Sequence, residues 1–244
     1  NALILFLGSI TIISSCLLAL VVLWRRKQFS VRVLRLLVGA YVLRSVTAII
    51  VELTGTAFGQ VDFYEFDNAL WEVAQSVRAG VITAPLELAS QTGNLYYIPY
   101  TTVYSPVYVI FGHRSLLMRF MFALIGTLFV FNAYRLGQVA YTERAGVYTA
   151  GFAAVFPYWL YLSSIFYRDM LIMLVLSQIL LIAIESDQTK IIFSVINLTG
   201  LSIVAIMLRP ENAPVVGILV IMYVYNLLKC VDYIPSIVSN VIII

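Results

Sequence analysis

Charged residues are scarce in this sequence, and apolar residues are abundant. Lys, Arg, Asp and Glu together make up 11% of the 244 residues, and hydrophobic residues make up 62%. A water-soluble domain carries about 25% charged and about 45–50% apolar residues, so this chain has too few charges to cover a soluble fold. The composition therefore predicts an integral membrane protein built of transmembrane α-helices.

The sequence also lacks the residues that several kinds of site need. His113 is the only histidine, so neither a histidine-based metal site nor a Ser-His-Asp arrangement has enough parts, and we interpret it as an ordinary loop residue. Cys16 and Cys230 lie far apart and form no metal-ligand spacing. The net charge of +3 is spread over the loops, so we expect no nucleic-acid partner.

Seven apolar runs are close to the length that spans a bilayer as a helix. They occupy residues 2–24, 33–54, 115–134, 145–162, 170–184, 191–208 and 213–228. Trp24 and Tyr134 stand at run ends, as is typical of membrane interfaces. No repeat or linker divides the chain. The prediction is one all-α domain over residues 1–244, a polytopic bundle of about seven spans, with transmembrane helices filling residues 115–228.

The distribution of charge predicts the side of the membrane that each loop faces. The loop between the first two runs holds Arg25, Arg26, Lys27, Arg32 and Arg35, and the positive-inside rule places it in the cytoplasm. By alternation, nine basic residues lie inside and four outside. The carboxylates show the opposite bias, and those outside are Asp62, Glu65, Asp67, Glu72, Glu87, Asp169 and Glu211. Polar chemistry is therefore expected on the extracytoplasmic face of a cell membrane or an endoplasmic-reticulum-type membrane.

Residues 55–114 form the long extracytoplasmic loop of this arrangement. Residues 63–79 repeat apolar side chains at spacings of three and four, which is typical of an amphipathic helix lying in the headgroup plane. An extended stretch follows, in which Pro99 and Pro106 are expected to break regular structure. Its tyrosines are interpreted as an interfacial aromatic belt, in preference to a ligand-stacking role, and are Tyr96, Tyr97, Tyr100, Tyr104 and Tyr108.

The order of features over roughly residues 55–175 resembles a known family. An acidic residue and an interfacial helix come first, and an extended loop that ends in residues 103–108 and 111–115 follows. A helix through residues 134–137 comes next, and then Pro157 and Arg168-Asp169. This order is similar to that of the GT-C superfamily of membrane glycosyltransferases, especially the protein-mannosyltransferase and aminoarabinose-transferase-like branch. The family's Asp-Glu-x-x-Tyr-x-x-Ala pattern falls on Asp62, Phe63, Phe66 and Ala69, so its leading Asp and trailing Ala are retained.

The resemblance implies sugar transfer from a polyprenyl-phosphate-linked donor to an acceptor on the extracytoplasmic face. A carboxylate in the first outer loop is then catalytic, and Asp62 is expected to be the base, with Asp169 as its partner and Glu65 as a stand-in for the missing acid. Arg168 and Arg209 are expected to bind the donor phosphate. No cofactor is expected, apart from a divalent cation that the carboxylates would hold.

Structural interpretations of the same residues stay open. Arg168-Asp169 fits an interfacial ion pair at a helix start, and residues 209–212 fit a capped turn. Arg44 falls near the middle of the second run, where an unpaired charge costs at least about 2.5–3.5 kcal/mol on insertion scales. It should face the bundle interior and pair with a carboxylate or with backbone carbonyls, in a functional or a packing role.

Two other functions remain open beside the transferase hypothesis. One is a non-catalytic membrane scaffold, or a subunit of a larger membrane complex. The other is a transporter or flippase fragment, for which polar residues inside several spans are expected. The partners expected for a transferase are a polyprenyl-phosphate lipid donor and membrane lipids.

Overall fold

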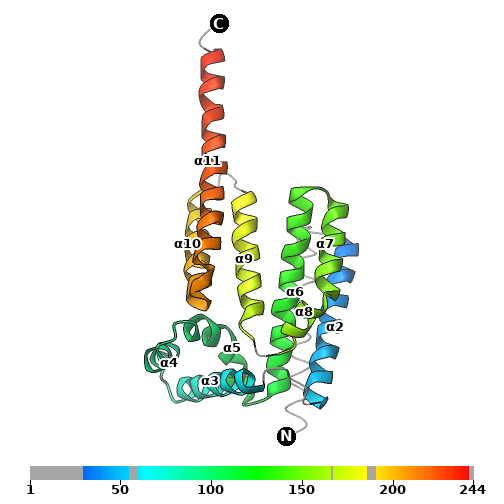
Figure 1. The fold of residues 1–244 in the computed structure, drawn as a ribbon, viewed down its shortest axis with the longest axis vertical. Helices are drawn as coiled ribbons and strands as arrows, with labels where there is room; N and C mark the ends of the chain where they lie inside the picture. The colour runs from blue at the N-terminus through cyan, green and yellow to red at the C-terminus, as the bar shows by residue number, and fades with distance from the viewer. Residues whose placement is uncertain (1–29, 55–59, 166, 186–190, 242–244) are drawn as a thin grey trace. The chain divides into compact units, whose positions relative to one another are not determined.

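The fold is helical throughout the part of the chain that the structure describes (Figure 1). The computed structural model describes residues 30–54, 60–165, 167–185 and 191–241, and the side chains of these residues up to 228, except those of 60–63. No strand occurs among the described residues. The predicted all-α class is therefore confirmed for them, whereas the first apolar run, residues 2–24, lies outside them.

Four helical stretches are long and apolar enough to cross a membrane. They are α2 (Val31–Thr54), α6 (Ser115–Ala140), α10 (Ile191–Leu208) and the stretch Pro210–Leu228, which covers η2 (Pro210–Asn212) and most of α11 (Ala213–Val241). These helices match four of the predicted runs. Helix α9 (Asp169–Ile184) is apolar but has only 16 residues. Length and composition of these helices indicate a membrane protein.

The predicted span over residues 145–162 is not one helix. The structure has α7 (Glu143–Val155) and then α8 (Pro157–Leu162), with Phe156 between them at φ −60° and ψ 119°. Pro157 has no N–H, so it cannot donate to the carbonyl of Ala153 as a continuing helix would require. The helix therefore ends before the proline, and the prediction of one unbroken helix over this run is wrong.

The chain divides into two compact units, residues 1–174 and residues 175–244. In the first unit α6 is the core helix, because 72% of its most apolar stretch is buried, against 33% for α2. Helices α6 and α7 lie very close together, since a Cβ on Gly146 would come within 2.6 Å of the Tyr134 carbonyl oxygen. Small residues at such contacts are typical of helices packed in a membrane.

The second unit contains the rest of α9, with α10, η2 and α11. The 3-10 turn η2 joins α10 to α11, and Asn212 Nδ2 donates to the carbonyl of Ala205 across this turn at 3.1 Å. Asn226 Nδ2 donates to the carbonyl of Ala183 at 3.0 Å, which ties α11 to α9. The Ala205 carbonyl thus accepts two hydrogen bonds, because the Arg209 N–H also donates to it at 3.2 Å.

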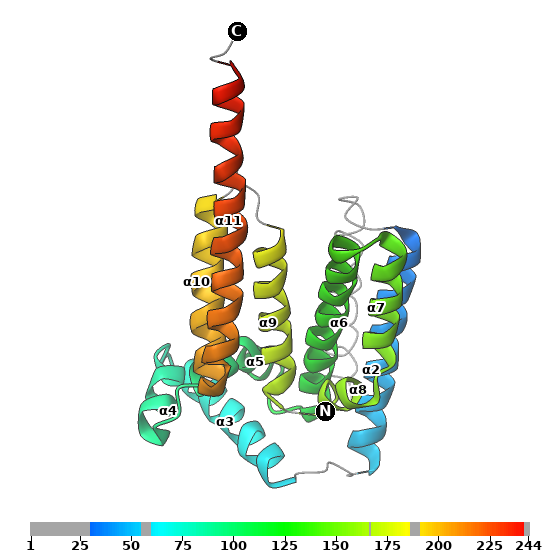
Figure 2. The same cartoon turned by 45° about the horizontal axis from the view of Figure 1, so that its top comes forward.

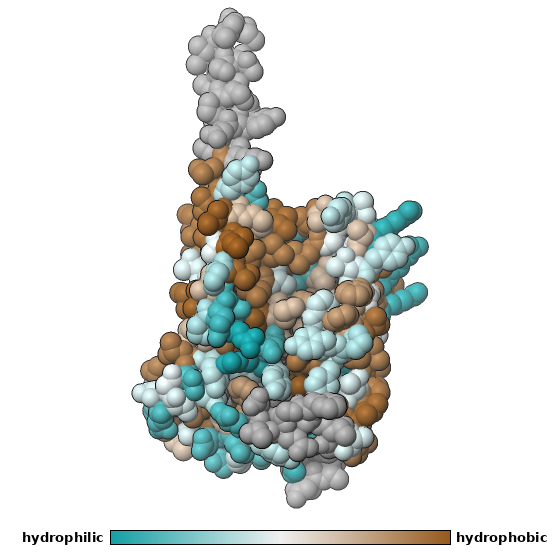
Figure 3. Space-filling model, in the orientation of Figure 1, coloured by the Kyte–Doolittle hydropathy of each residue, from teal (hydrophilic) through white to brown (hydrophobic). Residues whose placement is uncertain are grey.

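Three helices fill the predicted outer loop: α3 (Gln60–Arg78), α4 (Ala84–Thr92) and α5 (Tyr97–Phe111). Helix α3 runs crosswise to α2 and α6, at the end where α2 finishes and α6 begins (Figures 1 and 2). Its predicted apolar face is buried at Phe66, Leu70 and Val73. Figure 3 shows hydrophilic residues over α3 and α4, whereas apolar residues cover much of the long helices.

The stretch predicted as extended is the regular helix α5, and the prediction that prolines break it is wrong. Pro99 lies in the first turn, where a helix needs no N–H donor. Pro106 lies inside the helix and has no N–H to donate to the carbonyl of Thr102. Both residues are exposed. Water can bond that carbonyl, so this proline is tolerated.

The tyrosines of α5 form a buried face and not an exposed belt. Tyr97, Tyr100, Tyr104 and Tyr108 follow one another at spacings of three and four, and each is at most 2% exposed. They pack toward α3 and α6, for example through Tyr104 stacked on Phe122 at 4.1 Å between ring centres. The interpretation of these four residues as an interfacial belt is therefore wrong.

Arg44 is fully buried and binds backbone carbonyls. Its guanidinium donates to Ala154 at 3.1 Å, to Ala153 at 3.0 Å and to Ala40 of its own helix at 3.4 Å. The first two carbonyls belong to the last turn of α7, where helix carbonyls lack partners, and Pro157 removes the donor that Ala153 would otherwise have. Arg44 thus caps α7 and joins it to α2.

Gly126 of α6 makes room for this arginine. A Cβ at this position would lie 2.6 Å from Ser163 Cβ and 2.7 Å from Arg44 Nε. We expect Gly126→Val to lower the free energy of unfolding by about 1–3 kcal/mol, because the helix or the guanidinium must shift. Thermal unfolding of the purified protein in detergent measures the effect.

Gly151 of α7 offers the matched control for this substitution. A Cβ there would meet nothing within 4 Å, so Gly151→Ala should leave stability unchanged or raise it by up to about 1 kcal/mol. Equal melting temperatures for Gly126→Val and the wild type would show that Arg44 does not need this space.

Candidate functional site

Charged side chains gather at one end of the first unit, where α2 ends, α6 begins and α3 crosses. We call this group the polar end, and its members are Glu52, Glu65, Asp67, His113, Arg119 and Arg168. Each of the three carboxylates accepts a hydrogen bond from a neighbouring element. The polar end is therefore an ordered array of acid and base groups.

Asp67 of α3 is the most enclosed of these carboxylates, with 8% of the residue exposed. Tyr108 donates its hydroxyl hydrogen to Oδ1, and His113 Nε2 lies 2.8 Å from Oδ2. The imidazole stacks on Trp71 with 5.2 Å between ring centres and an angle of 13°. Both oxygens of Asp67 are thus occupied, and the carboxylate holds the histidine against α3.

Arg78, the last residue of α3, fixes the same corner. Its Nε donates to the carbonyl of Val109 and its NH2 to that of Tyr108, both at 2.9 Å. These carbonyls lie in the last turn of α5, and the Tyr108 carbonyl also accepts a hydrogen bond from the Gly112 N–H at 3.0 Å. The chain then turns at Gly112, where φ is +77° and a side chain would be strained. Arg78 and Gly112 together place His113 beside Asp67.

Glu52, at the outer end of α2, faces the first turns of α6. Ser115 Oγ donates to Glu52 Oε1, and Arg119 Nε lies 2.7 Å from Oε2. Arg119 is almost fully buried and also donates to the carbonyl of Ser164 at 2.6 Å. One ion pair therefore joins α2 and α6 to the segment that leads from α8 toward Arg168.

Glu65 and Arg168 meet through two adjacent tyrosines. Tyr97 donates its hydroxyl hydrogen to Glu65 Oε1 at 2.8 Å, and the Arg168 guanidinium carbon lies 4.1 Å from the centre of the Tyr96 ring. Phe66 contacts both Tyr96, at 6.0 Å between ring centres, and Tyr167, at 6.4 Å. The turn before α9 thus lies against Phe66 of α3. The Arg168 guanidinium lies over Tyr96, next to the tyrosine that binds Glu65.

The residues predicted from the sequence fall in different places. Asp62 lies in the first turns of α3, but its side chain is outside the described residues. Asp169 begins α9, where a helix N-terminus favours a carboxylate. Arg209 belongs to the second unit, where it is exposed and precedes η2. The first unit places Glu65 and Arg168 against the adjacent tyrosines Tyr97 and Tyr96, whereas Arg209 belongs to the second unit.

The sequence did not predict the ion pair of Arg119 with Glu52, nor the contact of His113 with Asp67. The available signal was that Glu52 and Arg119 both occupy the outer ends of neighbouring apolar runs. Charges at the same depth of adjacent helices are expected to pair. His113 offered no such signal, because its partner lies 46 residues earlier on another helix.

The tyrosines that surround these carboxylates hold their protons tightly. Burial raises the pKa of Tyr97, Tyr100, Tyr104 and Tyr108 well above the ordinary value of a phenol, and the negative charge of Asp67 adds to this effect at Tyr108. After burial, the neighbouring phenols Tyr104 and Tyr108, and then Asp67 and Tyr97, raise the pKa of Tyr100 further.

These raised pKa values predict alkaline unfolding. The unfolded chain loses its phenol protons near pH 10 while the folded chain keeps these four, so the stability they contribute is present below about pH 10 and is lost above it. We expect an absorbance titration of phenolate to show late ionisation that coincides with loss of helical circular dichroism.

Tyr104 provides a control for the titration. Its buried hydroxyl has no hydrogen-bond partner among the described residues, so Tyr104→Phe should remove one late phenol without loss of stability. Ionisation of every tyrosine near pH 10, with the helices intact, would contradict the buried arrangement.

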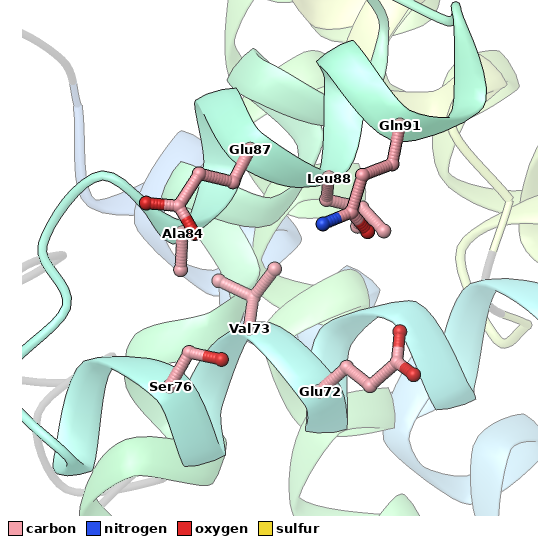
Figure 4. A pocket seen from close by; sticks show the side chains of 7 residues that line it. All are labelled: Glu72, Val73, Ser76, Ala84, Glu87, Leu88 and Gln91. Atoms are coloured by element: carbon pink, nitrogen blue, oxygen red, sulfur yellow. The ribbon is translucent and has the colours of Figure 1, made fainter.

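A pocket of about 220 Å³ lies between α3 and α4. Its lining residues are Glu72, Val73, Ser76, Ala84, Glu87, Leu88 and Gln91, and Figure 4 shows Leu88 and Gln91 pointing from α4 toward α3. Glu87 also accepts a hydrogen bond from Thr83 at 2.6 Å. Glu65 and Asp169, the two residues predicted to be catalytic whose side chains are described, do not line this pocket.

The carboxylates of the predicted outer loop were expected to be able to hold a divalent cation. In the parts of the chain that the structure describes, no three His, Cys, Asp or Glu side chains lie close enough to hold a metal ion.

Comparison with known proteins leaves the polar end as the main guide to function. No protein-family model matches the chain, and no curated protein and no solved structure matches it.

Proposed function

We propose that this chain is a membrane glycosyltransferase that moves a sugar from a polyprenyl-phosphate-linked donor to an acceptor on the extracytoplasmic face. The observation that supports this most is the polar end, where fixed carboxylates, an arginine over a tyrosine ring and a histidine occupy one end of the long helices. Sugar transfer needs negative groups near the sugar and positive charge near the leaving phosphate. The resemblance to the GT-C superfamily points to the same reaction.

In this proposal the carboxylates and Arg168 have separate roles. Positive charge develops on the anomeric carbon as its bond to phosphate breaks, and Asp62, Glu65 and Asp169 stabilise that charge. Arg168 binds the donor phosphate, because a guanidinium matches phosphate oxygens in geometry and charge. Its position on Tyr96, beside the Tyr97–Glu65 bond, would bring phosphate and sugar to adjacent groups. Arg209 remains a second phosphate-binding proposal.

The membrane arrangement is part of the proposal. Helix α3 would be the interfacial helix, since it runs crosswise to the apolar helices α2 and α6 and keeps polar residues such as Glu72 exposed (Figures 1 and 3). About seven spans would result if the run 2–24, the broken pair α7–α8 and α9 joined the four long helical stretches. A lipid phosphate at headgroup depth then lies level with the polar end.

A transporter is less well supported. The sequence offered Arg44 as a charged residue near the middle of a span, and this residue binds the carbonyls that close α7. Such a role is structural, because it pairs the charge with the ends of a helix. A non-catalytic scaffold or complex subunit remains the outcome if no transfer is found.

Transfer by the purified protein in liposomes tests the proposal. The donors are polyprenyl phosphates carrying labelled mannose, glucose or aminoarabinose, and a lipid and protein extract supplies acceptors. We expect label in the acceptor fraction and stoichiometric release of polyprenyl phosphate from at least one donor. Release from none of the donors would contradict the proposal and leave the scaffold function standing.

A further inference from the structure

His113 has surroundings that the sequence did not indicate. One ring nitrogen, Nε2, faces Asp67, and the ring is stacked on Trp71. The Tyr108 ring lies edge-on to the imidazole, with 5.0 Å between ring centres and 82° between the ring planes. The side chain is nevertheless 39% exposed. Its second nitrogen, Nδ1, makes no hydrogen bond with any described residue. The imidazole is thus fixed in orientation, with one nitrogen open to another molecule.

A carboxylate that binds one nitrogen of an imidazole affects the protonation of the whole ring. It fixes which ring nitrogen carries the hydrogen, and it stabilises the positive charge that forms when the other nitrogen accepts a proton. Asp67 is suited to this role because it is enclosed and anchored a second time by Tyr108. The nearest positive group on α3, Arg78, is occupied by the carbonyls of α5 and lies over Trp71.

The three carboxylates of the polar end, Asp67, Glu65 and Glu52, are less suited to accept a proton. Both oxygens of Asp67 are taken, and Glu65 and Glu52 each accept hydrogen bonds from α5 or α6. A carboxyl group ordinarily titrates near pH 4 and an imidazole near pH 6.5, so at neutral pH the imidazole is the stronger base. A general base works best when its titration lies near the working pH.

We infer that His113 is the general base of the transfer reaction and that Asp67 is its positioning residue. This inference rests on the proposed function and moves the role of base from Asp62 to His113. The hydroxyl hydrogen of the acceptor passes to Nδ1 while the acceptor oxygen bonds to the anomeric carbon. The bond from that carbon to the phosphate oxygen breaks, and its electron pair leaves on the phosphate. His113 then releases the proton to water.

His113→Gln in the full chain tests the inference. The glutamine amide can still donate to Asp67, but it accepts no proton at neutral pH. We expect transfer from the active polyprenyl-phosphate sugar to fall about 100-fold to 10,000-fold, while binding of that donor is unchanged. Size-exclusion chromatography and helical circular dichroism check that the variant is folded.

Chemical rescue separates catalysis from folding. His113→Ala should regain part of its activity when imidazole is added, whereas Asp62→Asn should not respond to imidazole. Transfer by His113→Gln at the wild-type rate, or failure of imidazole to restore His113→Ala, overturns the inference while an active wild type keeps the proposed function. A wild-type protein that releases polyprenyl phosphate from none of the donors overturns both.

Discussion

Arg44→Ala is expected to lower the free energy of unfolding by at least about 3 kcal/mol, the largest effect on stability predicted for any residue of the first unit. The substitution leaves the carbonyls of Ala153 and Ala154 buried without a donor, and it empties the space beside Gly126. Two terms therefore add, the cost of unpaired polar groups and the cost of a cavity. Chemical or thermal unfolding in detergent measures the sum.

Two further variants separate these terms. Arg44→Met keeps most of the volume but has no donor, so it should recover only the cavity part. Arg35→Ala removes an exposed arginine from the same helix and should change stability by no more than about 0.5 kcal/mol. If Arg44→Ala melted with the wild type, the arginine would not be the group that closes α7.

Asp62→Asn and Glu65→Gln are each expected to reduce sugar transfer about 100-fold to 1,000-fold. Both substitutions keep the size of the side chain and remove the negative charge that stabilises the developing charge on the sugar. The amide oxygen introduced by Glu65→Gln can still accept a hydrogen bond from Tyr97, so the fold around Phe66 should be kept. Initial rates with a saturating polyprenyl-phosphate donor measure the effect.

Glu72→Gln is the matched control for these carboxylates. Glu72 lies on the same helix, is exposed and lines the pocket toward α4 and not the polar end. Its replacement should leave the rate of transfer near that of the wild type. Equal losses at Glu72 and Glu65 would mean that the charge of the whole helix matters and that no carboxylate has a specific role.

The long helices could be predicted because a membrane span needs a long apolar run and little else. The runs 33–54 and 191–208 match α2 and α10 almost to the residue. Helix ends were harder, because a single proline decides them through one missing hydrogen bond. Pro157 ends α7, whereas Pro106 is accommodated in α5 since its unpaired carbonyl lies on an exposed side.

The polar end could be predicted only in part. The amphipathic pattern around Phe66 located α3. The partners within it depend on tertiary contacts between residues far apart in sequence, as with His113 and Asp67 or Arg119 and Glu52. A pattern read along one chain does not contain those distances, so His113 was interpreted as an ordinary loop residue.

The central claim is that the polar end transfers sugar from a lipid phosphate, and one comparison tests it most directly. Wild-type protein and Arg168→Gln are reconstituted in liposomes and supplied with labelled polyprenyl-phosphate sugars at low donor concentration. We predict that the wild type transfers the label and that Arg168→Gln does so about 10-fold to 100-fold more slowly, because a charged contact to phosphate is lost. Equal transfer by both proteins, or none by the wild type, would contradict the account.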